Sequence, residues 1–393
     1  MWLLAAGIAL AALAVGLLYR YLDWKADRRW APHEPGQVIV SFEDGVTDDE
    51  RERMIRMAGC TVMDSNVHLG TYTLKSSRKM RKVLEHFNSM QGIHYAEPNF
   101  LYQATLMPDD PFFPEYQYGP QVIQAPEAWN VTVSRPEVVI AILDTGVQAG
   151  HPDLAPKLAA GYNFVENNDM PTDRNGHGTH VAGIAAAATD NGLGIAGIAP
   201  ATRLLPVKVL GDNGTGNLNQ VANGIVYAVN RGAQIINLSL GSSASAVTLQ
   251  NAVRFAADRG VLLVGAAGNN GVSVPNYPAA YAEVLAVAST TEQDVRSSFS
   301  NYGLWVDVAA PGDRILSTYL GGNYAYLSGT SMAAPHVSGV AALLVAQGRN
   351  QAQARAAIQQ TADPVPGTGE WWVYGRVNAA RAVRFQAAEA QKE

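Results

Sequence analysis

The pattern of hydrophobic and polar residues divides the chain into four stretches of different character. Residues 1–19 carry no charged side chain and are rich in Leu and Ala. Short alternating and amphipathic runs occupy residues 36–104, and longer apolar runs alternate with Ala-rich stretches in residues 105–385. Residues 386–393 are mostly polar. We therefore expect a hydrophobic segment within residues 1–30, a small domain, a large domain and a polar tail.

The stretch 36–104 has the pattern of a small α+β domain. Alternation of polar and apolar positions predicts strands, while a capping box and helical spacing predict two helices. The predicted strands are 37–42, 70–74 and 93–96, and the predicted helices are 48–57 and 78–90. Prolines at positions 98, 108, 111 and 114 predict a linker after this domain.

The large domain has the pattern of an α/β fold. Near-continuous apolar runs alternate with Ala-rich helical stretches. The predicted strands are 138–143, 235–238, 261–264 and 284–287. Strands that are apolar throughout are buried on both faces, so we expect a parallel sheet between two helix layers.

Composition and charge narrow the possible functions. The chain has 393 residues, of which 16% are charged, and a formal net charge of −6. No basic run with interleaved aromatic residues occurs, so we expect no nucleic acid partner. Cys60 is the single cysteine, which makes an intramolecular disulfide impossible. We interpret Cys60 as a small buried residue rather than a catalytic nucleophile.

Three polar residues lie in segments that fit the carboxyl ends of strands, where the functional groups of a parallel sheet usually lie. Asp144 follows the strand 138–143, His177 opens an Ala-rich helix, and Ser331 starts another helix. Each alone has an ordinary interpretation, as a turn residue, a structural histidine or a helix cap. Together they can perform nucleophilic catalysis, because a serine hydroxyl needs a histidine, oriented by a carboxylate, to remove its proton. The helix behind Ser331 adds an N–H and a dipole for an oxyanion.

The segments around these residues resemble the three signatures of the subtilisin family of serine endopeptidases. They are Asp144-Thr145-Gly146, His177-Gly178-Thr179-His180 and Gly329-Thr330-Ser331-Met332-Ala333, in the chain order Asp, His, Ser. The resemblance runs from about residue 110 to residue 385 and is most evident with the thermitase branch, as in Gln117-Tyr118-Gly119-Pro120-Gln121 and Tyr277-Pro278-Ala279. Val181 departs from that branch, in which a cysteine is expected at this position.

The same segments exclude other functions. Ser331 lies in Gly-x-Ser-x-Ala and not in the Gly-x-Ser-x-Gly of lipases and esterases. No Gly-x-Gly-x-x-Gly follows an early strand, as a dinucleotide-binding enzyme requires. A pseudoprotease on the same fold would lack a member of the triad or of the oxyanion site, and none is missing. We interpret His180 and His336 as structural, and His151, which precedes Pro152-Asp153, as a loop residue.

The resemblance implies the fold, the reaction and the remaining site residues. It implies a subtilisin-like α/β fold and hydrolysis of protein and peptide substrates through an acyl-enzyme intermediate. Asn269 would donate its side-chain amide to the oxyanion, beside the Ser331 N–H. The residues implied to hold the substrate are Gly214, Thr215, Gly216, Leu238, Ser239, Leu240, Gly241, Ala266, Ala267 and Gly268. Small uncharged pocket walls predict a preference for apolar or aromatic side chains.

The resemblance also implies structural Ca²⁺, an ion that binds six to eight oxygens from carboxylates, amides and backbone carbonyls. The residues that would hold the main ion are Asp110, Asp153 and Asn191, with the carbonyls of Ala188, Leu193 and Ile195. A second site would use the stretch Asn163, Glu166, Asn168, Asp169 and Asp173. A solvated acidic loop explains that second stretch equally well. A metal would also replace the missing disulfides if the protein works outside the cytoplasm.

Residues 36–104 resemble the inhibitor-type propeptides of this family, which are small ferredoxin-like α+β domains. Tyr95-Ala96-Glu97-Pro98-Asn99 is typical of their end. The C-terminal tail of such a domain would block the catalytic cleft, so the propeptide is an expected intramolecular inhibitor. We expect autoprocessing between Ala104 and Leu106, which leaves residues 105–385 as the catalytic domain.

The N-terminal segment carries the prediction about location. Residues 1–19 are about long enough to cross a bilayer, but nothing decides between a cleaved signal peptide and a retained membrane anchor. The basic residues that follow are Arg20, Lys25, Arg28 and Arg29, and the positive-inside rule would place what comes after them in the cytoplasm. An intracellular membrane-bound protease is therefore the alternative. We expect an extracytoplasmic enzyme, secreted or anchored, because the remainder resembles an exported zymogen.

Overall fold

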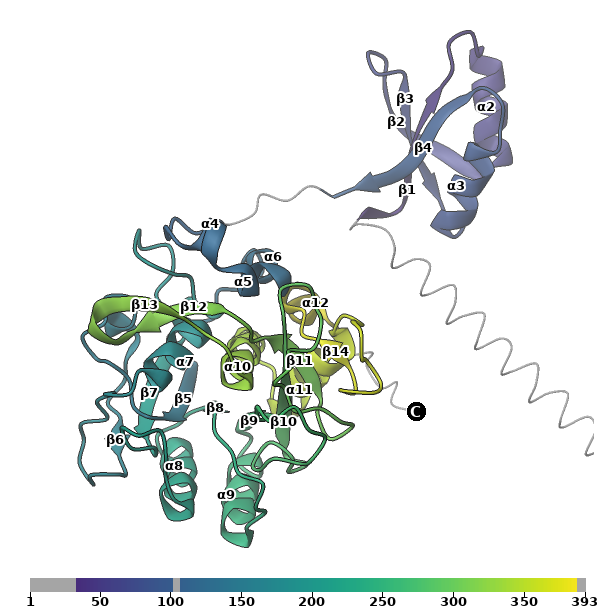
Figure 1. Cartoon of the computed structure of the whole chain (residues 1–393). Coiled ribbons are helices and arrows are strands. Elements are labelled where there is room, and N and C mark those ends of the chain that lie inside the picture. Colours follow the sequence, from purple (N-terminus) through teal and green to yellow (C-terminus); the bar gives the residue numbers. More distant parts are fainter. Residues whose placement is uncertain (1–32, 102–106, 387–393) are drawn as a thin grey trace, which may run out of the picture. The chain divides into compact units, whose positions relative to one another are not determined.

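The described residues form two compact units, residues 33–101 and residues 107–386 (Figure 1). The computed structural model describes residues 33–101 and 107–386. The predicted hydrophobic segment and residues 387–393 lie outside this described part. Within it, no helix is both long enough and apolar enough to cross a membrane.

The first unit is an antiparallel four-stranded sheet with two helices on one face (Figure 1). Its elements are β1 (His33–Phe42), α2 (Asp48–Met57), β2 (Cys60–Asn66), β3 (Thr71–Ser76), α3 (Met80–Asn88) and β4 (Ile93–Phe100). The strand order β2-β3-β1-β4 and the β-α-β-β-α-β sequence of elements make this the expected ferredoxin-like arrangement. Val40, Leu74 and Phe87 form the fully buried centre between sheet and helices.

Local interactions explain where helix α2 begins and why the sequence pattern did not predict β2 or the position of Pro98. The Thr47 side chain accepts from Glu50 N–H and the Glu50 carboxylate accepts from Thr47 N–H, so the predicted capping box is formed at α2. Strand β2 was not predicted, because it is an edge strand whose residues after Cys60 are all exposed. Pro98 lies in the edge strand β4 and not in a linker; an edge tolerates a residue without an N–H.

The second unit is built on an eight-stranded parallel sheet with helices on both faces (Figure 1). Its strands are β5 (Val139–Asp144), β6 (Tyr162–Asn163), β7 (Arg203–Lys208), β8 (Ile235–Leu238), β9 (Leu262–Ala266), β10 (Val284–Thr290), β11 (Val308–Pro311) and β14 (Gly375–Arg376), in the order β14-β11-β10-β9-β8-β5-β7-β6. A separate hairpin consists of β12 (Ile315–Tyr319) and β13 (Asn323–Leu327).

The helices of this unit are α4 (Phe113–Tyr116), α5 (Tyr118–Val122), α6 (Ala125–Trp129), α7 (His177–Ala186), α8 (Leu218–Asn230), α9 (Val247–Ala257), α10 (Thr330–Ala346), α11 (Gln351–Thr361) and α12 (Ala379–Arg384). Strand β5 shows why two layers are needed. Ile140 and Ile142 enter the core cluster that contains α7 and α10, whereas Ala141 and Leu143 enter the cluster beneath α8 and α9. The predicted α/β fold with a parallel sheet between helix layers is confirmed.

Three parts of this unit differ from the sequence-based prediction. Pro206 interrupts the apolar run of β7, which hid this strand. Of the prolines in the expected linker, Pro114 instead lies in the first turn of α4, where an N–H would lack an intrahelical partner. The β12–β13 hairpin was not predicted; Ser317 Oγ donates to the His180 carbonyl at 2.7 Å and thereby fastens it to α7.

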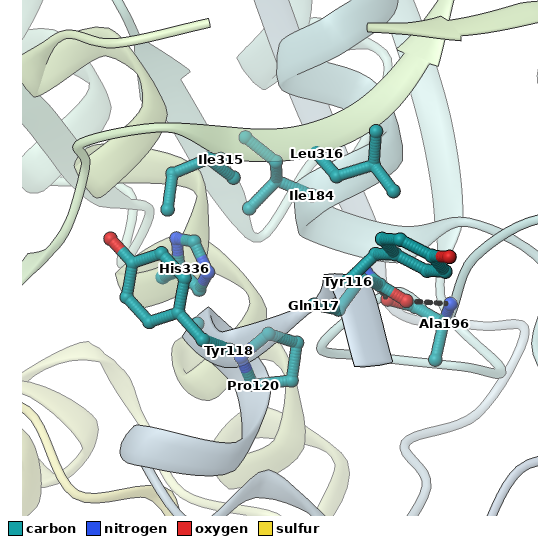
Figure 2. Close-up of a pocket in the computed structure, with 10 residues that line it drawn as sticks. Tyr116, Gln117, Tyr118, Pro120, Ile184, Ala196, Ile315, Leu316 and His336 are labelled. Atoms are coloured by element: carbon teal, nitrogen blue, oxygen red, sulfur yellow. Dashed lines mark hydrogen bonds between the residues drawn. The ribbon is translucent and has the colours of Figure 1, made fainter. Parts of the chain in front are cut away.

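Two fully buried histidines sit where α7, α10 and the hairpin meet. His180 Nε2 lies 3.0 Å from the Ile315 carbonyl and 2.9 Å from the Ala325 carbonyl. His336 Nδ1 donates to the Met332 carbonyl at 2.9 Å, and its ring faces a cavity of about 10 Å³ between α5, α7 and β12 (Figure 2). Burial lowers the pKa of each ring to about 4.

Acidification from pH 7 to pH 4 is expected to destabilise the folded chain through these rings. In the unfolded chain their pKa is near the ordinary value of about 6.5. Below that pH the unfolded state therefore binds protons that the native state excludes, and each ring removes up to about 3 kcal/mol of stability by pH 4. Urea unfolding as a function of pH measures this loss.

His336→Asn is the matched control for this effect. An asparagine amide can still donate to the Met332 carbonyl but does not titrate, so the variant should lose less stability than the wild type over the same range. Equal losses in the two proteins would show that His336 does not carry the effect.

Candidate active site

Strand β5 and helix α7 bring Asp144 and His177 together. Asp144 is the last residue of β5 and His177 the first residue of α7. His177 Nδ1 lies 2.7 Å from Asp144 Oδ1, which also accepts from Thr145 N–H at 2.7 Å. The Asp144 side chain is completely buried, and that of His177 is 28% exposed. A buried carboxylate thus orients an imidazole that solvent can reach.

Glycine at position 178 permits this close approach. A Cβ there would lie 2.1 Å from the Gly146 carbonyl oxygen and 3.0 Å from Asp144 Cβ. Any side chain would therefore push the start of α7 away from the end of β5. The glycine in the His-Gly-Thr-His segment is required by packing and not by chain flexibility.

The environment of His177 favours its charged form. Burial opposes protonation, but the negative charge of Asp144, its hydrogen bond and the charge of Asp173 outweigh burial, so the pKa of His177 is raised above its usual value. The second oxygen of Asp144, Oδ2, is buried and has no hydrogen-bond partner within the described residues. The carboxylate therefore keeps a strong field directed at the imidazole.

Ser331 stands in the first turn of α10, where its N–H has no intrahelical acceptor. Its hydroxyl donates to the Ser239 carbonyl at 3.2 Å, and the Ser239 hydroxyl donates to the Ser331 carbonyl at 2.8 Å. Asn237 and Ser338 continue this chain of hydrogen bonds into the core. In the described part of the chain, Ser331 Oγ thus points to the end of β8, and no hydrogen bond joins it to His177.

Asn269 lies in the exposed loop after β9 and faces the start of α10. Its Oδ1 accepts from Thr330 N–H at 2.8 Å and from Thr330 Oγ1 at 2.9 Å. Since the oxygen is occupied by these two donors, Nδ2 is the amide group that remains to donate elsewhere. A Cβ built on Gly329 would lie 3.4 Å from this Nδ2 and 3.6 Å from Ser331 N, so both donors border the same point.

A groove of about 550 Å³ begins at His177 and runs between two glycine-containing segments. Its lining residues are Thr145, Asn175, His177, Leu210, Gly214, Thr215, Gly216, Asn217, Leu218, Val221, Ser239, Leu240, Gly241, Ser242, Ala244, Ala246, Leu249 and Tyr277. His177 is the only titratable lining residue besides Tyr277, so the wall is largely apolar or neutral. Its volume lies within the usual range of ligand-binding clefts.

The structure brings together six of the ten residues that were predicted to hold substrate. Those six are Gly214, Thr215, Gly216, Ser239, Leu240 and Gly241. Leu238 is instead fully buried in the core beneath α8 and α9, and the side chains of Ala266 and Ala267 are likewise buried. Gly268 lies outside the groove, where its N–H donates to Thr330 Oγ1 at 3.0 Å.

The sequence did not indicate several of the residues that line the groove. Leu218 and Val221 lie in the first turns of α8, and Leu249 lies in the first turn of α9. Apolar residues at such helical positions look like ordinary core positions in a sequence. The available signal was the Gly214-Thr215-Gly216 segment directly before the capping box of α8, which places the helix start beside a predicted substrate segment.

The residues predicted to bind the main calcium ion converge on the loop before Gly197. Asp153 Oδ1 accepts from Asn191 Nδ2 at 3.1 Å, and Asp153 Oδ2 accepts from Ile195 N–H at 3.0 Å and from Tyr324 Oη at 2.8 Å. Asp110 Oδ2 accepts from Asp190 N–H at 2.8 Å. Its Oδ1 is buried without a partner in the described part of the chain.

Electrostatics at this loop favour a bound cation. Burial raises the pKa of Asp110 to about 6; the Asp190 N–H opposes this shift, and the charges of Asp153 and Asp109 add to it. No cluster of three or more His, Cys, Asp or Glu side chains suited to a metal occurs among the described residues. Amide and carbonyl oxygens would therefore have to complete the site. Such an oxygen set suits Ca²⁺ and not Zn²⁺.

The loop predicted as a second calcium site contains a side-chain cation of its own. Arg174 Nη1 lies 3.2 Å from Glu166 Oε1 and 3.5 Å from Asp212 Oδ2. The Asn163 amide oxygen accepts from Val165 N–H and Glu166 N–H. The oxygens of this loop are thus already bound by an arginine and by backbone N–H groups, and we therefore propose no metal there.

Comparison with known proteins places the chain in a family. The Subtilase family model matches residues 135–383, and the Fervidolysin N-terminal prodomain model matches residues 26–99. Thermitase from Thermoactinomyces vulgaris is 55% identical over 278 residues, which cover 71% of this chain and 99% of thermitase. The chain is a member of the subtilase family.

Further comparisons extend this result to both units. A thermophilic serine proteinase from Bacillus sp. strain AK1 is 47% identical to this subtilase over 351 residues, 89% of this chain and 88% of the relative. A solved protease from Pseudoalteromonas arctica has a TM-score of 0.67 and 32% identity, covering 71% of this chain and 99% of the other. The subtilase is thus a serine endopeptidase made as a zymogen with an N-terminal prodomain, and the predicted family, including its thermitase-like character, is confirmed.

Proposed function

We propose that Asp144, His177 and Ser331 are the catalytic triad of this endopeptidase and that Asn269 Nδ2 and Ser331 N–H bind the oxyanion. The observation that carries the proposal is the 2.7 Å contact between His177 Nδ1 and the buried Asp144, at the end of a groove that also contains Ser239, the hydrogen-bond partner of Ser331. Asp144 leaves Nε2 as the ring nitrogen that can act as base.

The reaction begins with a rotation of the Ser331 hydroxyl. The 3.2 Å bond to the Ser239 carbonyl is long for an O–H donor, so little is lost when the hydroxyl turns to His177 Nε2. His177 takes the proton as Ser331 Oγ attacks the scissile carbonyl carbon. The protonated ring then gives the proton to the departing amine, which leaves an acyl-enzyme. Water then gives a proton to the same ring and attacks the acyl carbon. The bond from this carbon to Ser331 Oγ breaks, the ring returns the proton to Oγ, and the acid is released.

The oxyanion forms where two fixed donors meet. Ser331 N–H belongs to the first turn of α10 and adds the dipole of a 17-residue helix. Asn269 is held by Thr330, which binds its amide oxygen and so fixes the direction of Nδ2. Removing the corresponding donor in subtilisin costs about 10²–10³ in turnover, a magnitude established for that enzyme itself.

The groove supports an extended peptide with mainly apolar side chains. The segments Gly214–Gly216 and Ser239–Gly241 would pair with the substrate backbone from both sides, in the manner of added strands. No Lys, Arg, Asp or Glu lines the described groove. A charged substrate side chain would find no partner of opposite sign there, whereas Leu210, Leu218 and Tyr277 offer apolar contact.

We propose that the prodomain inhibits the enzyme until the chain is cut between Ala104 and Leu106, and that the processed enzyme works outside the cytoplasm. The domain boundaries at about residues 30, 104 and 385 belong to the same proposal. The prodomain match supports the inhibitor role, and the family of the relatives supports export. Whether the N-terminal segment is a signal peptide or a membrane anchor decides between a secreted and a tethered enzyme.

Ser331→Ala should abolish processing, because Ser331 is the nucleophile of the cut. Expressed in a protease-deficient host, the wild type should yield a catalytic unit outside the cytoplasm. Its N-terminal sequence should start after an uncharged residue between Ala104 and Leu106. Ser331→Ala should remain at full length and lose labelling by a fluorophosphonate.

Ser328→Ala is the matched control, since Ser328 is an exposed serine three residues away that contacts Asp313 and Arg314. It should be processed and labelled like the wild type. Normal processing of the Ser331→Ala chain would reject Ser331 as the nucleophile. Active enzyme confined to the cytoplasm would reject export.

We also propose that Asp110, Asp153 and Asn191 hold a structural Ca²⁺, with the carbonyls of Ala188, Leu193 and Ile195. The buried, unpartnered Asp110 Oδ1 is the feature that fits a cation best. A calcium ion there would neutralise Asp110 and Asp153 and stabilise the loop that follows α7.

Chelation of calcium should lower the melting temperature of the wild type. A site occupied at 100-fold excess over Kd stabilises the native state by about 2.7 kcal/mol. Asp110→Asn should remove most of the calcium-dependent increment. Without calcium this variant should be no less stable than the wild type, because its amide oxygen can still accept from Asp190 N–H and no carboxyl must be buried. Scanning calorimetry with calcium and with EDTA measures both effects.

The exposed Asp169→Asn serves as the charge control and should keep the full increment. An unchanged wild-type melting temperature in EDTA would contradict calcium binding. Equal increments in wild type and Asp110→Asn would contradict this location.

A further inference from the structure

A second buried carboxylate, Asp173, lies behind the start of α7. Only 4% of this residue is exposed. Its Oδ1 accepts from Thr145 Oγ1, Asn175 N–H and Gly176 N–H, each at 2.9 Å. Its Oδ2 accepts from Thr179 N–H at 2.9 Å and from Thr179 Oγ1 at 2.6 Å. Both oxygens are therefore fully used, by five donors from two segments of the chain.

These contacts join the residues on either side of the Asp144–His177 pair. Thr145 directly follows Asp144, and its hydroxyl also accepts from Gly178 N–H at 2.9 Å. Thr179 belongs to the first turn of α7, two residues after His177. Asp173 thus fastens the end of β5 to the start of α7 through groups that do not belong to the triad.

The donors to Asp173 are hydroxyl and backbone N–H groups, so its negative charge is not cancelled. No cation lies within ion-pair distance of Asp173 in the part of the chain that the structure describes. The two nearby cations are engaged elsewhere: Lys208 Nζ donates to Asp212 Oδ1 at 2.8 Å and to the Thr145 carbonyl at 2.6 Å, and Arg174 pairs with Glu166 and Asp212.

The other titratable groups around His177 cannot replace this charge. On its own helix, His180 is buried and its pKa is lowered to about 4, so it is neutral at working pH. From β5, Asp144 contacts Nδ1 directly. From β7, Lys208 donates to Asp212 and to the Thr145 carbonyl, and it brings no negative charge. Asp173 is therefore the second source of negative potential at the imidazole, and its charge acts to raise the pKa of His177.

We propose that Asp173 is a positioning residue of the catalytic centre, which fixes the Asp144 turn against the first turn of α7 and supplies a second negative charge to the His177 imidazolium. This inference rests on the proposed triad. During acylation the ring becomes positive, and a fixed charge that favours the imidazolium lowers the barrier without touching the substrate. The five donors hold this charge in place, so no reorganisation is needed during the reaction.

Asp173→Asn tests both roles in the processed enzyme. The substitution removes the negative charge of Asp173 and turns an NH₂ group toward the hydroxyl and N–H donors that now bind the carboxylate. We expect kcat to fall about 10- to 100-fold, because misplacing a catalytic group by a fraction of an ångström or more typically has an effect of this size. Without the charge the pKa of His177 falls, so the acid limb of the kcat/KM profile should move to lower pH. KM for a peptide substrate should change little. Asp169→Asn, at an exposed carboxylate of the same loop, should match the wild type.

Thr145→Val and Thr179→Val keep the charge and remove one hydroxyl donor from each oxygen of Asp173. Both should lower kcat while the acid limb stays at the wild-type pH. These variants also serve if Asp173→Asn does not fold. An Asp173→Asn enzyme whose acid limb coincides with the wild type, or wild-type kcat in both threonine variants, would overturn the inference.

The same series separates this inference from the triad itself. Wild-type enzyme that is not labelled at Ser331, or His177→Ala with undiminished kcat, would reject the triad and with it the role of Asp173. The role of Asp173 alone would be rejected by another result. In that result the fluorophosphonate labels Ser331 in the wild type, and the acid limb of the kcat/KM profile lies at the same pH in the wild type and in Asp173→Asn.

Discussion

The structure depends on one buried electrostatic contact, the pairing of Asp144 with His177. A fully buried carboxylate is costly unless charged or hydrogen-bonding partners surround it. Here the parallel sheet ends β5 at the point where α7 begins, and a glycine at 178 lets helix and strand touch. The contact can form only because sheet, helix start and glycine coincide. The field that raises the pKa of His177 is therefore a product of the fold.

The hairpin β12–β13 connects this contact with the other parts of the site. Its residues hold the carbonyls of α7 through Ser317 and Thr318, and Tyr324 donates to Asp153 in the proposed calcium loop. The same strand, β13, leads within four residues to Ser331. Ser331 and the proposed calcium loop are thus both connected to this short hairpin. The β12–β13 hairpin therefore supports both the proposed calcium loop and the position of Ser331.

The sequence predicted the elements whose role is visible in local pattern. Strands β5, β8 and β10 contain near-continuous apolar runs, and α2 carries its own capping box, so their place in the fold could be inferred. Strand β2 is an exposed edge, and β7 contains Pro206, so neither has the expected periodicity. The proposed triad and Asn269 could be named because their segments resemble those of a known family. Groove residues such as Val221 could not, since only the fold shows that a helix start faces the substrate.

The hydrogen-bond partners of Ser331 and Asp173 also could not be predicted from the sequence. Nothing in the sequence shows that the hydroxyl faces the Ser239 carbonyl or that Asp173 receives five donors. Both features arise from segments far apart in the chain that the sheet brings to one edge. Three-dimensional packing, and not residue type, decides which polar groups act together there.

Proton NMR of the folded enzyme examines the Asp144–His177 contact most directly. We expect a strongly deshielded resonance from the His177 Nδ1 proton, which should be present in the wild type and in Ser331→Ala and lost in Asp144→Asn. A folded wild type without this resonance, or a resonance that survives Asp144→Asn, would contradict the account.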